Sequence, residues 1–283
     1  MNISIRLKIK SLYNGLSSTE QRIANYILEN PNAVAYHSIS DLSSELHVAG
    51  STLFQFAKKL GYSGFKEFKM AILLQENEFS STSIHETIQD DDNFLTIAQK
   101  VFDSNTKSLN DTKKMLQLDK LQAAANMIAN SKTLYFFGVG GSEIVAQDAY
   151  HKFLRSPISV HHSTDYHMQI MEASLLTQQD CAICISHTGN AKETIKIAEK
   201  VKEVGAKVIV ITSHASSPLA KLGDSVFISI SEEIEFHSEA LSSRIAQLSI
   251  LDSLYVILMF MNKEKAKETL SKVRASISEI KQI

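Results

Sequence analysis

The chain has 283 residues, of which 44% are hydrophobic and 21% charged, and its formal net charge is -2. This length fits two domains of an ordinary globular protein, and the balanced charge excludes a globally basic binder of the histone kind while leaving local basic patches open. The N-terminus, MNISIRLKIK, lacks the apolar core of a secretory signal, and the most apolar late stretch, Leu248–Met261, is too short to span a membrane. We therefore expect no membrane association and a cytoplasmic location.

The first 75 residues are predicted to be helical. Ser17-Ser18-Thr19-Glu20 is a capping-box pattern that begins a helix, and Asn30-Pro31 ends it, because the residue before a proline avoids the α region. Two short helices follow over about 39–46 and 51–60, joined by a tight turn, and a further helix covers 62–74. Two short helices with a tight turn between them make a helix-turn-helix candidate.

Polar and basic side chains on the last two of these helices are candidates for DNA binding. They are Ser51, Thr52, Gln55, Lys58, Lys59, Lys66 and Lys69. Lysines position a protein on phosphates, and glutamine can bond adenine through two hydrogen bonds. The alternative is a solvated helix face with Leu53, Phe56 and Leu60 on its core side. Both interpretations can hold for one helix.

The segment Glu76–Asp92 contains six acids and no Lys or Arg, and we interpret it as part of an interdomain linker that does not contact nucleic acid. The predicted domains are a DNA-binding domain over 1–75, a linker and connecting helix over 76–106, and a second domain over 107–283.

Helical periodicity returns over 94–116 and 118–129, and strands then alternate with helices. The predicted strands cover 133–137, 158–161, 181–185, 206–212 and 225–230, and the predicted helices cover 142–154, 166–175, 192–204 and 240–261. This alternation predicts a parallel five-stranded sheet with helices on both faces, whose ligands bind beyond the carboxyl ends of the strands. The loops Gly138–Ser142 and Ser186–Asn190 fall on that edge.

The stretch Ala182–Glu193 predicts an anion site, because a strand breaks into a small, hydroxyl-bearing loop and a helix then begins. Backbone N–H groups and the helix dipole favour an anion there, and Ser186, Thr188 and Asn190 add side-chain donors. The loop contains no general base and no nucleophile–base pair.

The glycine-rich loop Gly138–Ser142 fits a dinucleotide fingerprint poorly, because the third glycine position is occupied by Glu143. A small anion site that uses Gly140, Gly141 and Ser142 fits better, and a plain tight turn is the alternative.

Two groups of side chains resemble metal or redox motifs, and we expect neither a metal nor a cofactor. Cys181 and Cys184 have CxxC spacing but lie in a predicted strand, where positions three apart point to opposite faces. A second group, which spans a strand end and a loop, is interpreted as a polar segment near the pocket mouth. It consists of His161, His162, Asp165 and His167.

The chain resembles the RpiR-type bacterial transcriptional regulators over nearly its whole length. The segments LSSTEQRIANYILENP and STLFQFAKKLGYSGFKEFK are similar to their N-terminal helix-turn-helix, and FFGVGGS, ISHTGNAKE and SSRIAQLSILDSLY are similar to a sugar isomerase (SIS) domain. The resemblance implies an all-α helix-turn-helix domain followed by an α/β SIS domain. It also implies a homodimer or homotetramer that binds double-stranded operator DNA and a sugar phosphate effector.

The resemblance also implies which residues hold the ligand. The family's SxSGxTxE loop, whose hydroxyls hold the phosphate, maps onto Ser186–Glu193, and Ser142 commonly joins the site. The ligand set is then Gly140, Gly141, Ser142, Ser186, His187, Thr188, Gly189, Asn190 and Glu193. Thr188 keeps the hydroxyl of the second serine, whereas Ala191 replaces the pattern's threonine and removes one donor. In the DNA-binding helix, Ala49 and Gln55 stand where the family often has serine and arginine.

The main hypothesis is a transcription factor whose DNA binding is controlled by a sugar phosphate and which has no catalytic residues. A sugar-phosphate isomerase or etherase, with Glu193, His237 and Glu239 as acid–base groups, is the competing hypothesis. A third is a sensor that acts only through protein partners. Residues near the start of the late helix are further pocket candidates, although Arg244 could equally be a surface or interface charge. They are Ser238, Ser242, Ser243 and Arg244.

Overall fold

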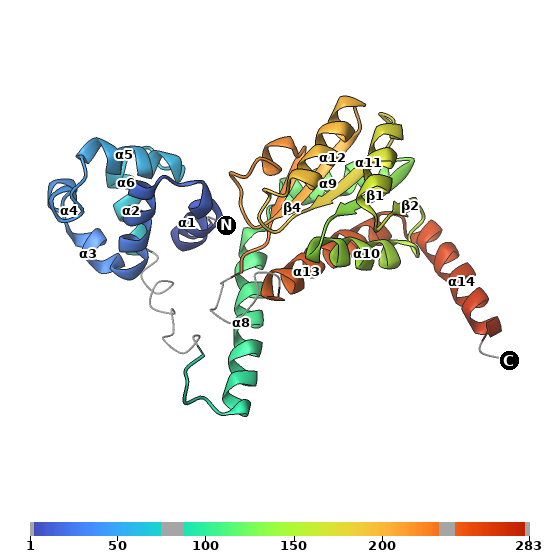
Figure 1. Ribbon diagram of the computed structural model, residues 1–283, viewed down its shortest axis with the longest axis horizontal. Coiled ribbons are helices and arrows are strands. Elements are labelled where there is room, and N and C mark those ends of the chain that lie inside the picture. The colour runs from blue at the N-terminus through green and yellow to red at the C-terminus, as the bar shows by residue number, and fades with distance from the viewer. Residues whose placement is uncertain (1–2, 75–87, 232–240, 281–283) are drawn as a thin grey trace. The chain divides into compact units, whose positions relative to one another are not determined.

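A computed structural model describes residues 3–74, 88–231 and 241–280 of the chain (Figure 1). The chain divides into two compact units, Met1–Lys100 and Val101–Ile283, which are described separately. Most of the acidic segment Glu76–Asp92 lies outside the described residues, so the extent of the linker stays a prediction.

The first unit is helical, as predicted. Its helices are α1 (Ile5–Leu12), η1 (Tyr13–Gly15), α2 (Ser18–Glu29), α3 (Pro31–Tyr36), α4 (Ile39–Glu45), α5 (Gly50–Lys59), α6 (Phe65–Leu74) and the first part of α8 (Phe94–Met115). The capping box at the start of α2 is confirmed, since Ser17 accepts from the Glu20 N–H and the Glu20 carboxylate accepts from the Ser17 N–H. Helix α3 begins directly at Pro31, whose missing N–H costs nothing at the first helical position.

Helices α4 and α5 form the predicted helix-turn-helix. His47 in the turn has a φ of 49°, which allows the reversal between the two helices. Leu53, Phe56 and Leu60 are buried in the core of the unit, so the predicted core side of α5 is confirmed. The opposite side of α5, including Ser51, Gln55 and Lys58, lies exposed.

The second unit is built on a five-stranded, fully parallel sheet, as predicted. The strands are β1 (Thr133–Gly138), β2 (Ser159–His162), β3 (Cys181–Ile185), β4 (Lys207–Thr212) and β5 (Ser225–Ile228), in the order β2-β1-β3-β4-β5. Strand β5 ends two residues earlier than expected, because the N–H of Ile230 bonds to the hydroxyl of Thr112 on α8 instead of to a neighbouring strand.

Helices cover both faces of this sheet. The remaining elements are α9 (Leu118–Ala129), α10 (Gly141–Phe153), α11 (Tyr166–Leu175), α12 (Lys192–Glu203), η2 (Ala220–Leu222), α13 (Leu241–Met261) and α14 (Lys263–Ile280). Helices α9, α10 and α13 enclose one core with side chains of the sheet, and α11 and α12 enclose the other. Cys181 belongs to the first core and Cys184 to the second, so the two thiols lie on opposite faces as expected. Burial raises the pKa of Cys181 to about 12, which keeps this thiol protonated.

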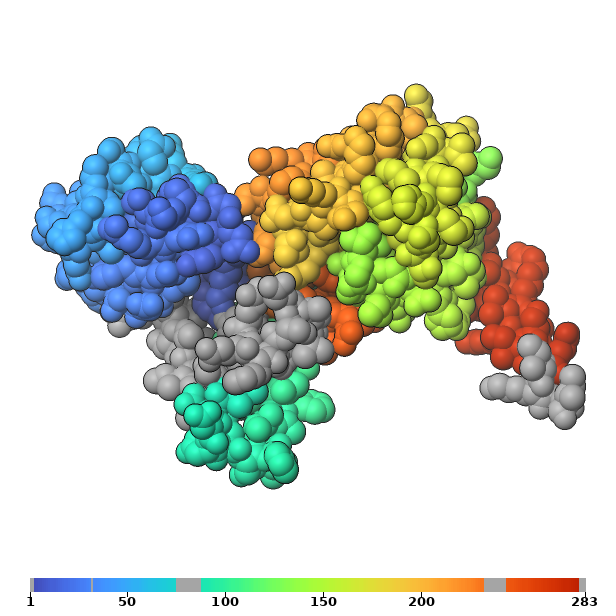
Figure 2. All heavy atoms as spheres, viewed as in Figure 1, coloured from blue at the N-terminus to red at the C-terminus, as the bar shows by residue number. Residues whose placement is uncertain are grey.

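Helix α13 is long and apolar enough over Ser243–Met261 to cross a membrane by length and composition alone. In this fold one side of the helix lies in the core beside α9 and α10, with Leu251, Leu254 and Leu258 fully buried. A core helix passes the same test, and packing explains the apolar residues on the buried side of α13. Helix α14 protrudes from the second unit and was not predicted from the sequence (Figures 1 and 2).

Candidate functional site

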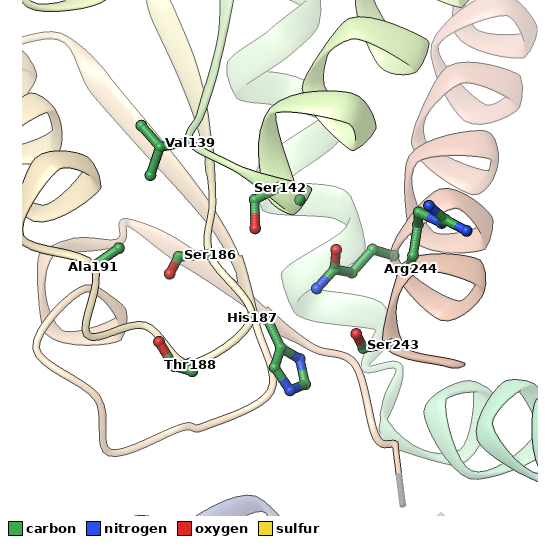
Figure 3. A pocket seen from close by; sticks show the side chains of 10 residues that line it. Val139, Ser142, Ser186, His187, Thr188, Ala191, Ser243 and Arg244 are labelled. Atoms are coloured by element: carbon green, nitrogen blue, oxygen red, sulfur yellow. The ribbon is translucent and has the colours of Figure 1, made fainter. Parts of the chain in front are cut away.

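A cavity of about 250 Å³ lies at the carboxyl edge of the sheet, where β1 and β3 lead into α10 and α12 (Figure 3). Its walls come from the two predicted loops and from the start of α13. The lining residues are Val139, Gly141, Ser142, Ser186, His187, Thr188, Ala191, Ser243, Arg244 and Gln247. The volume lies slightly below the usual range for small-molecule sites, about 300–1,000 Å³.

Hydroxyl groups of the β3–α12 loop are oriented by the backbone of the same loop. Ser186 Oγ accepts from the N–H of Gly189 at 3.2 Å, and Thr188 Oγ1 accepts from the N–H of Asn190 at 3.2 Å. Each hydroxyl acts as acceptor in these bonds, so its own proton can donate to a ligand. Figure 3 shows the hydroxyls of Ser186, Thr188 and Ser142 around one space. Ala191, the N-cap of α12, makes no side-chain capping bond.

The conformation of this loop depends on Gly189, whose φ is +65°. A Cβ atom at this position would lie 2.1 Å from Ser217 Oγ and 2.9 Å from Thr212 Oγ1. Only glycine fits, because the left-handed conformation and the close packing both disfavour a side chain.

The second loop joins β1 to α10 and brings Ser142 into the first turn of that helix. Gly140 is the N-cap residue with a φ of 57°, and the helix dipole favours an anion at this end. Glu143 Oε1 lies 3.1 Å from Nε2 of the buried His162 and does not line the cavity. The Glu143 carboxylate, which argued against a dinucleotide site in the sequence, therefore contacts a histidine of strand β2.

The side chain of His187 contacts the segment between β4 and η2. Its Nδ1 lies 2.8 Å from Ser213 Oγ, which in turn lies 3.0 Å from Ser229 Oγ. Such a contact fixes the ring orientation of a histidine at the cavity wall.

The third wall, from α13, contains two buried polar residues that lie on one side of the helix. Ser243 and Gln247 are one turn apart and are 1% and 2% exposed. The guanidinium of Arg244 points away from the three hydroxyls in Figure 3. Gln247 was not predicted as a site residue. The signal that could have found it is its place in the buried stripe that continues through Leu251 and Leu254.

The structure brings together five of the nine predicted ligand residues, which are Gly141, Ser142, Ser186, His187 and Thr188. Gly140 and Gly189 shape the two loops without lining the cavity. Asn190 and Glu193 are exposed and do not line it either. His237, Ser238 and Glu239 lie outside the described residues, as does the side chain of Ser242.

The predicted DNA-binding residues share an exposed region of α5 and α6. Ser51, Gln55, Lys58, Lys59 and Lys66 are exposed, and Thr52 is half-buried. Two of the lysines bond to protein oxygens, and Lys58 Nζ lies 5.7 Å from the centroid of the Phe54 ring. Lys59 Nζ lies 3.0 Å from both carboxylate oxygens of Glu20, and Lys69 donates to the carbonyl of His37.

Three residues of the group formed by His161, His162, Asp165 and His167 make contacts within the protein. His162 contacts Glu143, His161 stacks on Tyr135 with ring centroids 5.3 Å apart, and Asp165 caps α11. Over 3–74, 88–231 and 241–280, no group of three His, Cys, Asp or Glu residues is placed to hold a metal ion.

The arrangement suits a small anion joined to a polar body. None of the ten lining residues is acidic, whereas His187 and Arg244 are basic. Two helix N-termini and three hydroxyls converge at one end, and Ser243 and Gln247 lie on the α13 side.

The fold and site together define a regulator class in which a helix-turn-helix unit and an SIS unit belong to one chain. The family model described as "Helix-turn-helix domain, rpiR family" matches residues 3–81, and the model described as "SIS domain" matches residues 127–257. An HTH-type transcriptional regulator of Haemophilus influenzae is 33% identical over 94% of this chain and 93% of its own length. A second HTH-type transcriptional regulator, from Thermotoga maritima, is 32% identical over 97% of this chain and 98% of its own length. The chain therefore belongs to the RpiR family of HTH-type transcriptional regulators.

A solved structure agrees with this fold. The Vibrio vulnificus NanR protein, complexed with ManNAc-6P, is 23% identical, covers 99% of both chains and has a TM-score of 0.62.

Proposed function

We propose that this transcriptional regulator binds operator DNA through its N-terminal helix-turn-helix and that a sugar phosphate in the SIS cavity controls this binding. The observation that carries the proposal is the cavity itself, where three hydroxyls and two helix N-termini converge without any carboxylate. A phosphate monoester is a small anion that suits such a site. The ManNAc-6P complex of NanR supports a phosphorylated sugar as the ligand class.

On this proposal, the phosphate lies against Gly141, Ser142, Ser186 and Thr188, with His187 as a further donor. Gly140 and Gly189 set the loop conformations. Asn190 and Glu193 lie beside the helix start and contribute less than the sequence pattern implies, because neither lines the cavity.

The DNA-binding surface consists of the exposed side of α5 and the start of α6. Ser51, Thr52 and Gln55 contact bases or nearby phosphates, and the lysines contact phosphates. Lys58 and Lys66 are better placed for this than Lys59 and Lys69, since the latter two bond to protein oxygens. The domains are those proposed from the sequence, namely 1–75, 76–106 and 107–283.

We propose that the cavity senses its ligand without converting it. Proton transfer in an isomerase needs a base within hydrogen-bond reach of the sugar carbon. Glu193, which the competing enzyme hypothesis uses, is exposed and does not line the cavity. A cytoplasmic location follows from the DNA-binding role.

We propose a homodimer or homotetramer assembled through α13 and its surroundings. Val256 and Phe260 on the outer side of α13 are 61% and 68% exposed, an unusual amount of apolar surface for one helix. A dimer would present two helix-turn-helix units to a two-fold operator.

Replacing Ser186 by alanine should weaken sugar phosphate binding by about 10- to 150-fold. The hydroxyl donates to a charged group, and such a bond contributes about 1.5–3 kcal/mol. Isothermal titration calorimetry of the folded variant measures the change. Ser174→Ala is the matched control, because that exposed hydroxyl bonds only the Ile170 carbonyl on α11. Equal affinity of the Ser186 variant and the wild type would contradict the proposed anion site.

A further inference from the structure

Gln247 has a buried side-chain amide whose nitrogen is unsatisfied within the part of the chain that the structure describes. It is 2% exposed, and its Nε2 has no hydrogen-bond partner among the residues that the structure describes. A buried amide group without a partner destabilises the folded state. Such a group in a native core therefore needs an explanation.

The position of Gln247 supplies this explanation, because Gln247 lines the same cavity as the two anion-binding loops. It lies on the same side of α13 as Ser243, one turn further along the helix. Figure 3 shows this helix across the cavity from Ser186 and Thr188. The amide is thus placed to meet the part of a ligand that lies away from the phosphate.

We propose that Gln247 is a specificity-determining residue whose side-chain amide donates a hydrogen bond to an oxygen of the sugar, such as a hydroxyl, carbonyl or ring oxygen. This inference rests on the proposed function and extends it from the phosphate to the sugar body. A site that hydrogen-bonds a substrate oxygen rejects analogues lacking it more strongly than an apolar wall does. The amide is then retained for recognition, although it does not stabilise the ligand-free fold.

A second buried glutamine offers a matched contrast. Gln169 is fully buried, and its Nε2 donates to the carbonyls of Gly138 at 2.9 Å and Ser163 at 2.8 Å, while its Oε1 accepts from the Gly138 N–H. This side chain is satisfied by the protein and joins β1 to the loop before α11. Its replacement by leucine therefore has the opposite expected effect on stability.

The test compares Gln247→Leu with Gln169→Leu in thermal unfolding and in titrations. The probes are N-acetylmannosamine 6-phosphate, glucose 6-phosphate, arabinose 5-phosphate and inorganic phosphate. For Gln247→Leu we expect an unchanged or higher Tm without ligand, at least about tenfold weaker binding of the preferred sugar phosphate, and unchanged binding of inorganic phosphate. For Gln169→Leu we expect a Tm lower by several degrees.

Two outcomes would overturn the inference while leaving the proposed function intact. One is equal affinity of the wild type and Gln247→Leu for the preferred sugar phosphate. The other is a fall in the Tm of Gln247→Leu as large as that of Gln169→Leu, which would show that the amide is a structural group. Failure of every sugar phosphate to bind the wild-type protein would instead overturn the proposed function, and this inference with it.

Discussion

Replacing Gly189 by alanine should abolish sugar phosphate binding, with a Kd at least about 100-fold higher than that of the wild type. The added methyl group would lie 2.1 Å from Ser217 Oγ and 2.9 Å from Thr212 Oγ1, on a backbone with a φ of +65°. The strain of this conformation costs about 1–2 kcal/mol, and overpacking adds about 1–3 kcal/mol. A shift of the loop that relieves both moves Ser186 and Thr188 away from the ligand. Titration of the variant with the preferred sugar phosphate measures the loss.

The matched control is Gly140→Ala in the other loop. Gly140 also has a positive φ, of 57°, but no atom lies within 4 Å of the position that its Cβ would occupy. Backbone strain should therefore lower the free energy of unfolding of this variant by about 1–2 kcal/mol. The variant should bind the sugar phosphate more tightly than Gly189→Ala does. Wild-type affinity in Gly189→Ala would show that the β3–α12 loop does not hold the ligand.

Replacing Gln55 by alanine should cost about 1–3 kcal/mol of operator binding and relax the base preference at one position. Gln55 is exposed in the middle of α5, the predicted recognition helix, and an amide can pair with adenine through two hydrogen bonds. Selection of operators from a random DNA pool, followed by affinity measurements on the selected sequence, measures both effects.

Lys58→Ala should act differently, because Lys58 contacts phosphate on the proposed interface. It should weaken binding about equally for all sequences and lower the slope of log K against log salt by about 0.9. Lys196→Ala on α12 removes the same charge from the second unit and should change neither quantity. A sequence preference that survives Gln55→Ala unchanged, with a salt slope unaffected by Lys58→Ala, would rule out this face of α5 as the DNA surface.

Sequence periodicity predicted most of the secondary structure, because the signals are local. Short runs rich in apolar residues between helical segments indicated the five strands, and the capping box at Ser17–Glu20 indicated the start of α2. The strand order β2-β1-β3-β4-β5 was not predicted, since it depends on which crossovers pass over which face. Helix α14 was missed because it is mostly exposed and polar, so it lacks the apolar stripe on which the predictions relied.

The candidate site was predicted only where one loop contains the relevant residues. Ser186, Thr188 and Ser142 lie in loops whose composition indicates an anion site, and all three line the cavity. Gln247 belongs to a helix far along the chain, and only tertiary packing brings it to the same cavity. The partners of Lys59 and Lys69, which are Glu20 and the His37 carbonyl, are likewise set by the packing of separate helices.

The most direct test of a ligand-controlled regulator is the Kd of the full-length protein for its selected operator, measured at one salt concentration with and without a saturating sugar phosphate. The account predicts that the ligand changes this Kd by about 5- to 150-fold, the usual range of coupling between two sites. It also predicts that the parent unphosphorylated sugar has no effect and that Ser186→Ala needs more ligand for the same change. An operator Kd that stays the same at saturating concentrations of every sugar phosphate that binds the protein would contradict the account.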